Sequence, residues 1–223
     1  MTTFSTLIFD LDGTVAHTLP DVRKAINHTL HIMNMSERSL EQIQKVIGPG
    51  DMAFLEAILP GENQRVRDEF LGLFRAYYWD HCLDETRAFP GIPDILDRFR
   101  DLHLAVASNK PRKTAERILE GLSLLHYFDF VLGPDDVRIP KPDPEMIVKI
   151  LTGSNTDPSR ALLVGDTDRD LLAARSAGIA FCAARYGYGD MQVLEKSQPD
   201  YMIDSAIELV DIIENHQTPD RNA

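Results

Sequence analysis

Short apolar runs alternate with amphipathic segments along most of this chain. Five runs have the continuity of strands buried on both faces of a sheet, at residues 7–9, 104–107, 128–132, 161–165 and 179–184. Apolar residues at helical spacing mark the segments between them, at residues 92–102, 111–122, 145–151 and 171–177. Residues 201–203 are expected to add an edge strand before a last helix at 206–215. This alternation predicts an α/β fold, a doubly wound parallel sheet with right-handed crossovers.

The alternation is interrupted directly after the first run. Between residues 20 and 81 the apolar spacing is helical and indicates about four helices with no strand between them. We expect these helices to form a separate lobe, with their aromatic residues, Trp79 included, in its own core. The turn at residues 48–51 is rich in glycine and proline, which suits either a substrate-facing loop or a plain connection between helices.

Composition narrows the class of protein. The 223 residues are 43% hydrophobic and 26% charged, which is typical of a globular protein. A net charge of −12 disfavours nucleic acid and anionic membranes as partners, and an anionic substrate would need a bound cation or a few well-placed Lys and Arg. Cys82 and Cys182 form no CxxC pair, which argues against a disulfide framework or a zinc site and fits the cytoplasm. We see no signal-peptide pattern and no apolar run long enough to span a membrane.

Polar side chains collect where the predicted strands end. They are Asp10 and Asp12 after the first strand, Ser108 and Asn109 after the second, Lys141 in a proline-flanked loop after the third, and Asp166 and Asp170 after the fourth. Each has an ordinary explanation as a turn, helix cap or solvated loop residue. Because ligands in open α/β sheets bind outside the carboxyl ends of the strands, their order along the chain predicts one shared site.

Four segments resemble the signature motifs of the haloacid dehalogenase superfamily, at residues 10–14, 108–110, 141–144 and 165–170. The helical insert resembles the cap of its phosphoglycolate-phosphatase-like branch, and the resemblance covers roughly residues 7–207. It implies a Rossmann-like core made of residues 1–14 and 86–223, and an all-helical cap domain made of residues 15–85. It also implies Mg²⁺ and the transfer of a phosphoryl group to an aspartate.

By this resemblance Asp10 is the nucleophile, and Asp12 is the acid and then the base. Asp10 and Asp166 bind Mg²⁺ together with the backbone carbonyl of Asp12. A cation is also expected on physical grounds, because two carboxylates ~4 Å apart repel each other by about 4 kcal/mol at an effective dielectric near 20.

The resemblance assigns the remaining motif residues to substrate binding and charge neutralisation. Ser108 and the N–H of Asn109 hold phosphoryl oxygens, Lys141 neutralises the nucleophile, and Asp170 orients Lys141. Gly13 and Thr14 are counted with the substrate-binding residues. The chain departs from many relatives at His17, where they carry an aspartate; His17 either lines the cap–core interface and touches substrate or is an ordinary hinge residue.

These residues predict a Mg²⁺-dependent phosphatase that hydrolyses a small phosphomonoester, with 2-phosphoglycolate as the leading substrate. Asp12 favours phosphoester chemistry, because superfamily members that attack carbon lack an acid there. Two alternatives are a phosphomutase of the same superfamily and a phospho-aspartate signalling receiver, although receivers carry their aspartate at the third strand and have no such insert. The expected partner is a small phosphorylated metabolite, and the expected assembly is a monomer or homodimer in the cytoplasm.

Overall fold

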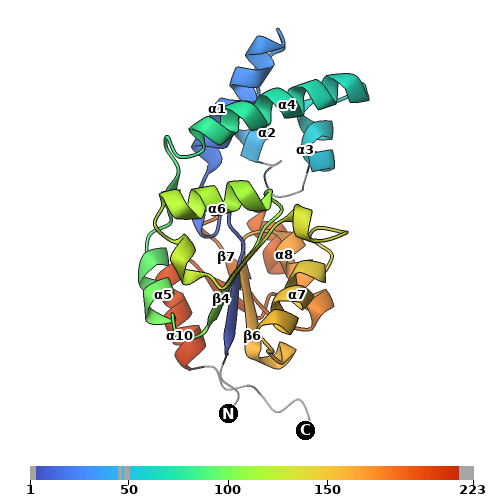
Figure 1. Cartoon of the computed structure of the whole chain (residues 1–223). Helices are drawn as coiled ribbons and strands as arrows, with labels where there is room; N and C mark the ends of the chain where they lie inside the picture. Colours follow the sequence, from blue (N-terminus) through green and yellow to red (C-terminus); the bar gives the residue numbers. More distant parts are fainter. Residues whose placement is uncertain (1–3, 45–46, 48–50, 216–223) are drawn as a thin grey trace.

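The computed structural model describes residues 4–44, 47 and 51–215, and its centre is a six-stranded parallel sheet (Figure 1). The strands lie side by side in the order β5 (Phe130–Leu132), β4 (His103–Ala107), β1 (Thr6–Phe9), β6 (Ala161–Gly165), β7 (Ala180–Ala184) and β8 (Tyr201–Ile203). Every neighbouring pair is parallel. The predicted doubly wound α/β fold is therefore confirmed, with the first strand at the middle of the sheet.

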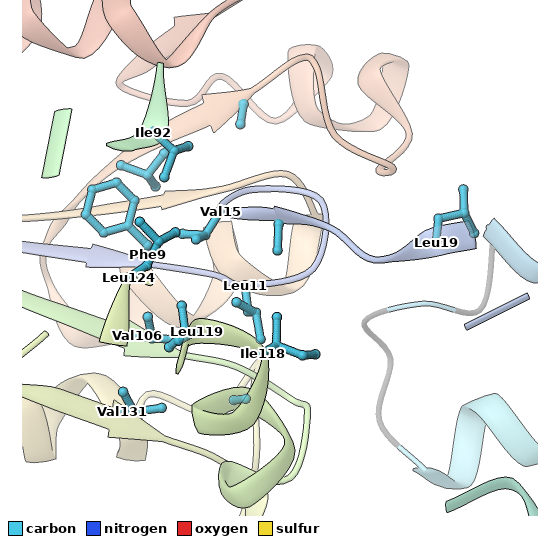
Figure 2. Close-up of a cluster of buried hydrophobic side chains, with 14 of the residues drawn as sticks. Phe9, Leu11, Val15, Leu19, Ile92, Val106, Ile118, Leu119, Leu124 and Val131 are labelled. Carbon is cyan, nitrogen blue, oxygen red and sulfur yellow. The ribbon is translucent and has the colours of Figure 1, made fainter. Parts of the chain in front are cut away.

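Helices cover both faces of the sheet (Figure 1). One face carries α5 (Ile92–Arg98), α6 (Arg112–Gly121) and α10 (Leu209–Glu214), and the other carries α7 (Glu145–Gly153), α8 (Asp168–Ala177) and α9 (Met191–Lys196). Successive residues of β1 point to opposite faces, so that Leu7 and Phe9 pack in one layer and Ile8 in the other. Figure 2 shows the first layer, where Phe9 and Val106 of adjacent strands lie near Leu119 of α6.

The element boundaries differ from the predictions in a few places. The helix predicted at residues 92–102 ends at Arg98, because the chain turns at Phe99, whose carbonyl accepts from the N–H of Leu102, and then enters β4. Helix α9 was not predicted, nor were four short 3₁₀ turns, at Leu125–Tyr127, Pro134–Asp136, Pro158–Arg160 and Ala206–Glu208. The last of these occupies the start of the predicted C-terminal helix.

A helical insert follows β1 and lies beyond the carboxyl edge of the sheet (Figure 1). It contains α1 (Leu19–Ile32), α2 (Leu40–Gln44), α3 (Asp51–Ile58) and α4 (Gln64–His81), in line with the four helices predicted. Most of the turn expected at residues 48–51 falls outside the described residues. We call residues 19–81 the insert below.

Aromatic rings pack against one another in the insert and continue the hydrophobic cluster on one face of the sheet. Phe70 stacks on Phe74 and Phe74 on Tyr78 along α4, with ring centroids 6.0 and 5.5 Å apart. Trp79, which was expected in the core of the insert, is instead 41% exposed, and the guanidinium of Arg117 from α6 lies 4.7 Å from its ring centroid. The reason is geometric, because Trp79 follows Tyr78 directly and therefore points to a different side of the helix.

The two connections between the insert and the sheet run side by side. They pair as a short antiparallel ladder of β2 (Ala16–His17) and β3 (Arg87–Ala88). Next to it the buried carboxylate of Asp21 accepts hydrogen bonds from the N–H groups of Glu85 and Thr86 and from the Thr86 hydroxyl, at 2.8–3.0 Å. The start of α1 is thereby fastened to the returning chain.

Among the residues that the structure describes, no helix has both the length and the apolar character that crossing a membrane requires.

Candidate active site

The central strands bring two aspartates to one point at the carboxyl edge of the sheet. β1 and β6 are parallel neighbours in which Phe9 pairs with Val164, and the N–H of Asp10 donates to the carbonyl of Val164 at 2.9 Å. Asp10 and Asp166 follow these strands, and both are buried. The two residues lie far apart in the sequence, but the parallel pairing of β1 with β6 places them close together in space.

Lys141 joins this pair to α8. Its ammonium nitrogen lies 2.8 Å from Oδ1 of Asp10 and 2.6 Å from Oδ1 of Asp170, and the side chain is only 3% exposed. The other oxygen of Asp170 accepts from the N–H and the hydroxyl of Thr167, the residue that caps α8. Asp170 is therefore held at the first turn of its helix, in a position that orients Lys141.

The carboxylates of Asp10, Asp166 and Asp170 form a cluster whose oxygen atoms lie within 4.8 Å of one another. Burial raises the pKa of Asp10 from 3.8 to about 7 and raises the pKa of Asp166 well above its ordinary value, and the neighbouring carboxylates act in the same direction on both. Burial acts to lower the pKa of Lys141, but the charges of Asp10 and Asp170 outweigh it and the pKa is raised. The cluster holds three carboxylates and only one ammonium group, so ionised carboxylates would leave it negatively charged. Mg²⁺ would balance this charge, and carboxylate oxygens are the ligands that it prefers.

Asp12 points to another side of the site. Its Oδ1 accepts from the Thr18 hydroxyl and lies 3.2 Å from the ammonium nitrogen of Lys110. That nitrogen also lies 3.1 Å from the hydroxyl of Tyr78 in α4, so Lys110 stands between the acid of the core and the insert. Lys110 belongs to the second motif, but no role for it was predicted from the sequence.

A cavity of about 120 Å³ opens between the core and the insert. The core contributes Asp10, Asp12, Ser108, Asn109, Lys110, Pro111, Thr114, Lys141, Thr167 and Arg169, and the insert contributes Val22, Ile47, Phe54, Phe74, Arg75 and Tyr78. The amide nitrogen of Asn109 donates to the backbone carbonyl of Lys141 at 3.0 Å, which ties two of the predicted segments together. The structure thus places Asp10, Asp12, Ser108, Asn109 and Lys141 around one space.

Gly13 and Thr14 lie against Asp166 rather than on this cavity. The Thr14 hydroxyl donates to Oδ1 of Asp166 at 3.1 Å, and a Cβ on Gly13, whose φ is +89°, would stand 2.3 Å from Oδ2. These contacts therefore fix the position of the Asp166 carboxylate. Direct contact of Gly13 or Thr14 with substrate stays a prediction.

His17 lies in the β2–β3 ladder, with its Nδ1 2.9 Å from the hydroxyl of Tyr188, and its ring contacts the rings of Phe89 and Tyr188, which also contact each other. It is not among the residues that line the cavity described above. A contact between His17 and substrate also stays a prediction.

The loop that follows β7 also contacts the site, although this was not predicted from the sequence. The N–H of Tyr188 donates to Oδ2 of Asp166 at 2.7 Å. Gly187 and Gly189 flank it, and a Cβ on Gly187 would stand 2.2 Å from the Cβ of Asp166. The alternation of glycine and tyrosine after a buried strand was the available signal, because glycine permits close approach of the backbone.

Comparison with known proteins agrees with this geometry. The model of the haloacid dehalogenase-like hydrolase family matches residues 7–184. The chain belongs to this family. The phosphoglycolate phosphatase of Aquifex aeolicus is 34% identical over 212 residues, which cover 94% of this chain and 97% of that one. Phosphoglycolate phosphatase 1 of Pseudomonas aeruginosa is 30% identical, over 92% of this chain and 78% of its own.

Among solved structures, that of a predicted phosphoglycolate phosphatase from Haemophilus somnus has a TM-score of 0.90 at 28% identity and covers 95% of this chain and 99% of its own. The resemblance inferred from the four motifs is therefore confirmed. With phosphatases of this family matching nearly the whole chain, the protein is a phosphoric monoester hydrolase.

Proposed function

We propose that this haloacid dehalogenase-like enzyme is a Mg²⁺-dependent phosphatase that hydrolyses 2-phosphoglycolate, or a closely similar small phosphomonoester, through an aspartyl-phosphate on Asp10. The observation that carries the proposal is the buried Asp10–Lys141–Asp170 bridge beside Asp166, at the floor of a cavity that the insert covers. The names of relatives that match nearly the whole chain support the substrate.

Mg²⁺ would be held by the carboxylates of Asp10 and Asp166 and by the backbone carbonyl of Asp12. When bound, the ion supplies positive charge that offsets the repulsion within the cluster and the charge of the transferring phosphoryl group. Asp170 is already engaged by Lys141 and Thr167, which favours a role in orienting Lys141 over one as a metal ligand.

Two displacements at phosphorus make up the reaction. In the first, a carboxylate oxygen of Asp10 forms a bond to phosphorus while the bond to the leaving oxygen breaks, and Asp12 donates a proton to that oxygen. In the second, Asp12 takes a proton from a water molecule whose oxygen bonds to phosphorus, and the bond to Asp10 breaks. Inorganic phosphate and the free Asp10 carboxylate result. Ser108, the N–H of Asn109 and Lys141 hold the phosphoryl oxygens throughout.

The insert selects the substrate in this proposal. Residues 15–85 form a cap that closes over the core and lines one side of the cavity in which a small phosphomonoester would bind. Arg75 of α4 lines that space opposite the catalytic carboxylates, where a guanidinium suits the carboxylate of 2-phosphoglycolate. The free thiols of Cys82 and Cys182 are compatible with a cytoplasmic enzyme.

Phosphate release from a panel of phosphometabolites, measured with Mg²⁺ and with chelator, tests the proposal. We expect metal-dependent release that is fastest with 2-phosphoglycolate and is abolished in Asp10→Asn, a change that keeps the size of the side chain. A different dominant substrate would overturn the assignment of 2-phosphoglycolate. Conversion to an isomer without free phosphate would favour a mutase, and substantial activity in Asp10→Asn would place the nucleophile elsewhere.

A further inference from the structure

Tyr188 makes contacts on two sides that the proposed reaction does not use. Its backbone N–H donates to Oδ2 of Asp166 at 2.7 Å, which places the residue directly against an expected metal ligand. Its side-chain hydroxyl lies 2.9 Å from Nδ1 of His17 and accepts from the N–H of Leu19 at 3.2 Å. One residue therefore touches both the carboxylate cluster and the start of the insert.

The contact with Asp166 leaves little freedom for the loop to move alone. A Cβ on Gly187 would stand 2.2 Å from the Cβ of Asp166, and one on Gly189 would stand 1.8 Å from its backbone oxygen. There is thus no room for a side chain between the backbone of these glycines and Asp166, so the loop packs directly against Asp166 and we expect a shift of either one to displace the other.

The contact with the insert is equally specific. Leu19 is the first residue of α1, and His17 belongs to the ladder that joins the insert to the sheet. Because the N–H of Leu19 donates to the Tyr188 hydroxyl, the hydroxyl proton is available to Nδ1 of His17. The backbone carbonyl of Tyr188 also accepts from the side-chain amide of Gln44 in α2, at 3.3 Å.

We propose that Tyr188 is a positioning residue that couples the placement of Asp166 to the attachment of the helical insert. A divalent cation held at Asp166 would then stiffen the two connections between insert and sheet, residues 15–19 and 85–89, which we call the hinge. This inference rests on the metal site of the proposed function. By linkage the coupling acts in both directions: whatever orders the hinge strengthens cation binding, and cation binding orders the hinge.

Hydrogen–deuterium exchange with Mg²⁺ as the only added ligand tests the coupling, with calorimetry to measure Mg²⁺ affinity independently of activity. In the unaltered protein we expect Mg²⁺ to slow exchange at residues 15–19 and 85–89. Tyr188→Phe keeps the ring and the backbone N–H but removes the hydroxyl. We expect it to lose the protection at the hinge and to bind Mg²⁺ about fivefold more weakly, the size of one net hydrogen bond.

Tyr186→Phe is the matched control, because it removes a hydroxyl from the same loop that donates to the carbonyl of Thr14 and not to the hinge. We expect it to keep the Mg²⁺-dependent protection. His17→Ala removes one of the two hinge partners of the Tyr188 hydroxyl and leaves the N–H of Leu19, so it should reproduce part of the loss, which keeps the test informative if Tyr188→Phe folds poorly.

The outcomes separate this inference from the function on which it rests. Mg²⁺ binding without protection at the hinge, or equal protection in Tyr188→Phe and the unaltered protein, would overturn the coupling and leave the phosphatase intact. Failure of Mg²⁺ to bind at all would overturn the proposed metal site and the coupling together.

Discussion

Lys141 shows how one side chain organises the candidate site. Its ammonium group is nearly inaccessible to solvent and contacts two carboxylates from different elements. Burial and the neighbouring carboxylates raise the pKa of Asp10 to about 7 even though the ammonium of Lys141 acts to lower it, so without Lys141 the ionised form of Asp10 would be less favourable still. The residue is therefore required both for charge balance and for the approach of an anionic phosphoryl group.

Replacing Lys141 with methionine should lower kcat by about 10²–10³-fold, the usual effect of removing one preorganised charge donor from a site of this kind. Steady-state phosphate release checks this expectation. Lys149→Met is the control, because Lys149 lies nearby in α7 with its side chain 48% exposed and should leave kcat unchanged. Equal effects of the two variants would contradict the role of Lys141.

Gly187→Ala should disturb the site through Asp166. The added Cβ would stand 2.2 Å from the Cβ of Asp166, so that side chain must move, and we expect a loss of about 1–3 kcal/mol in the free energy of unfolding together with weaker Mg²⁺ binding. Gly72→Ala is the matched control: nothing lies within 4 Å of its Cβ position, and within helix α4 the change should stabilise by up to about 1 kcal/mol. Urea unfolding measures both, and a neutral Gly187→Ala would refute the close packing.

At the scale of residues, the side chains that form the candidate site were predicted from the sequence, but the residues that hold them in place were not. Asp10, Ser108, Lys141 and Asp166 were predictable because each follows a strand or its loop in a parallel sheet. Tyr188 was not, because its part in the site comes from a backbone N–H, a group that every residue except proline carries. The placement of Lys110 depends on Tyr78 of the insert, which sequence spacing does not reveal.

Among the elements, buried strands were the easiest to predict. Five apolar runs correspond to β1, β4, β5, β6 and β7, because strands buried on both faces need continuous apolar sequence. The β2–β3 ladder was not predicted, since strands of two residues have no detectable period and exist only through their pairing. The helix α9 was not predicted: Leu194 is the one residue of its six that is buried, so its sequence shows no helical period of apolar positions.

Asp21 fastens the start of the insert to the returning chain. Asp21→Asn can keep its carbonyl oxygen at the Oδ2 position, but its NH₂ group then replaces Oδ1 and faces the N–H of Glu85, so we expect a loss of about 1–2 kcal/mol in the free energy of unfolding. Asp94→Asn in the exposed first turn of α5 is the control and should change it by less than about 0.5 kcal/mol. Chemical denaturation compares them, and a neutral Asp21→Asn would contradict a structural role for these hydrogen bonds.

The stability of the whole molecule should depend on pH through the buried cluster. Because the pKa of Asp10 is raised from 3.8 to about 7, the folded protein binds more protons than the unfolded chain between these values. Its stability therefore falls as the pH rises through this range. In chelator we expect a melting temperature about 5 °C higher at pH 5 than at pH 8.

Saturating Mg²⁺ should reduce this difference, because the cation stabilises the ionised carboxylates and binds only the folded state. Thermal melts at both pH values, with chelator and with Mg²⁺, measure the effect. A metal-free protein that is more stable at pH 8 than at pH 5 would contradict the raised pKa of the cluster.

The central place of β1 also bears on how the polypeptide is made. Leu7 pairs with Leu104 on one side and with Leu162 on the other, so the strand synthesised first must wait for partners synthesised much later. The whole insert is synthesised before either partner strand exists. β1 therefore stays unpaired until β4 has been made and lacks its second partner until β6 follows, and Asp10 and Asp166 can meet only after that.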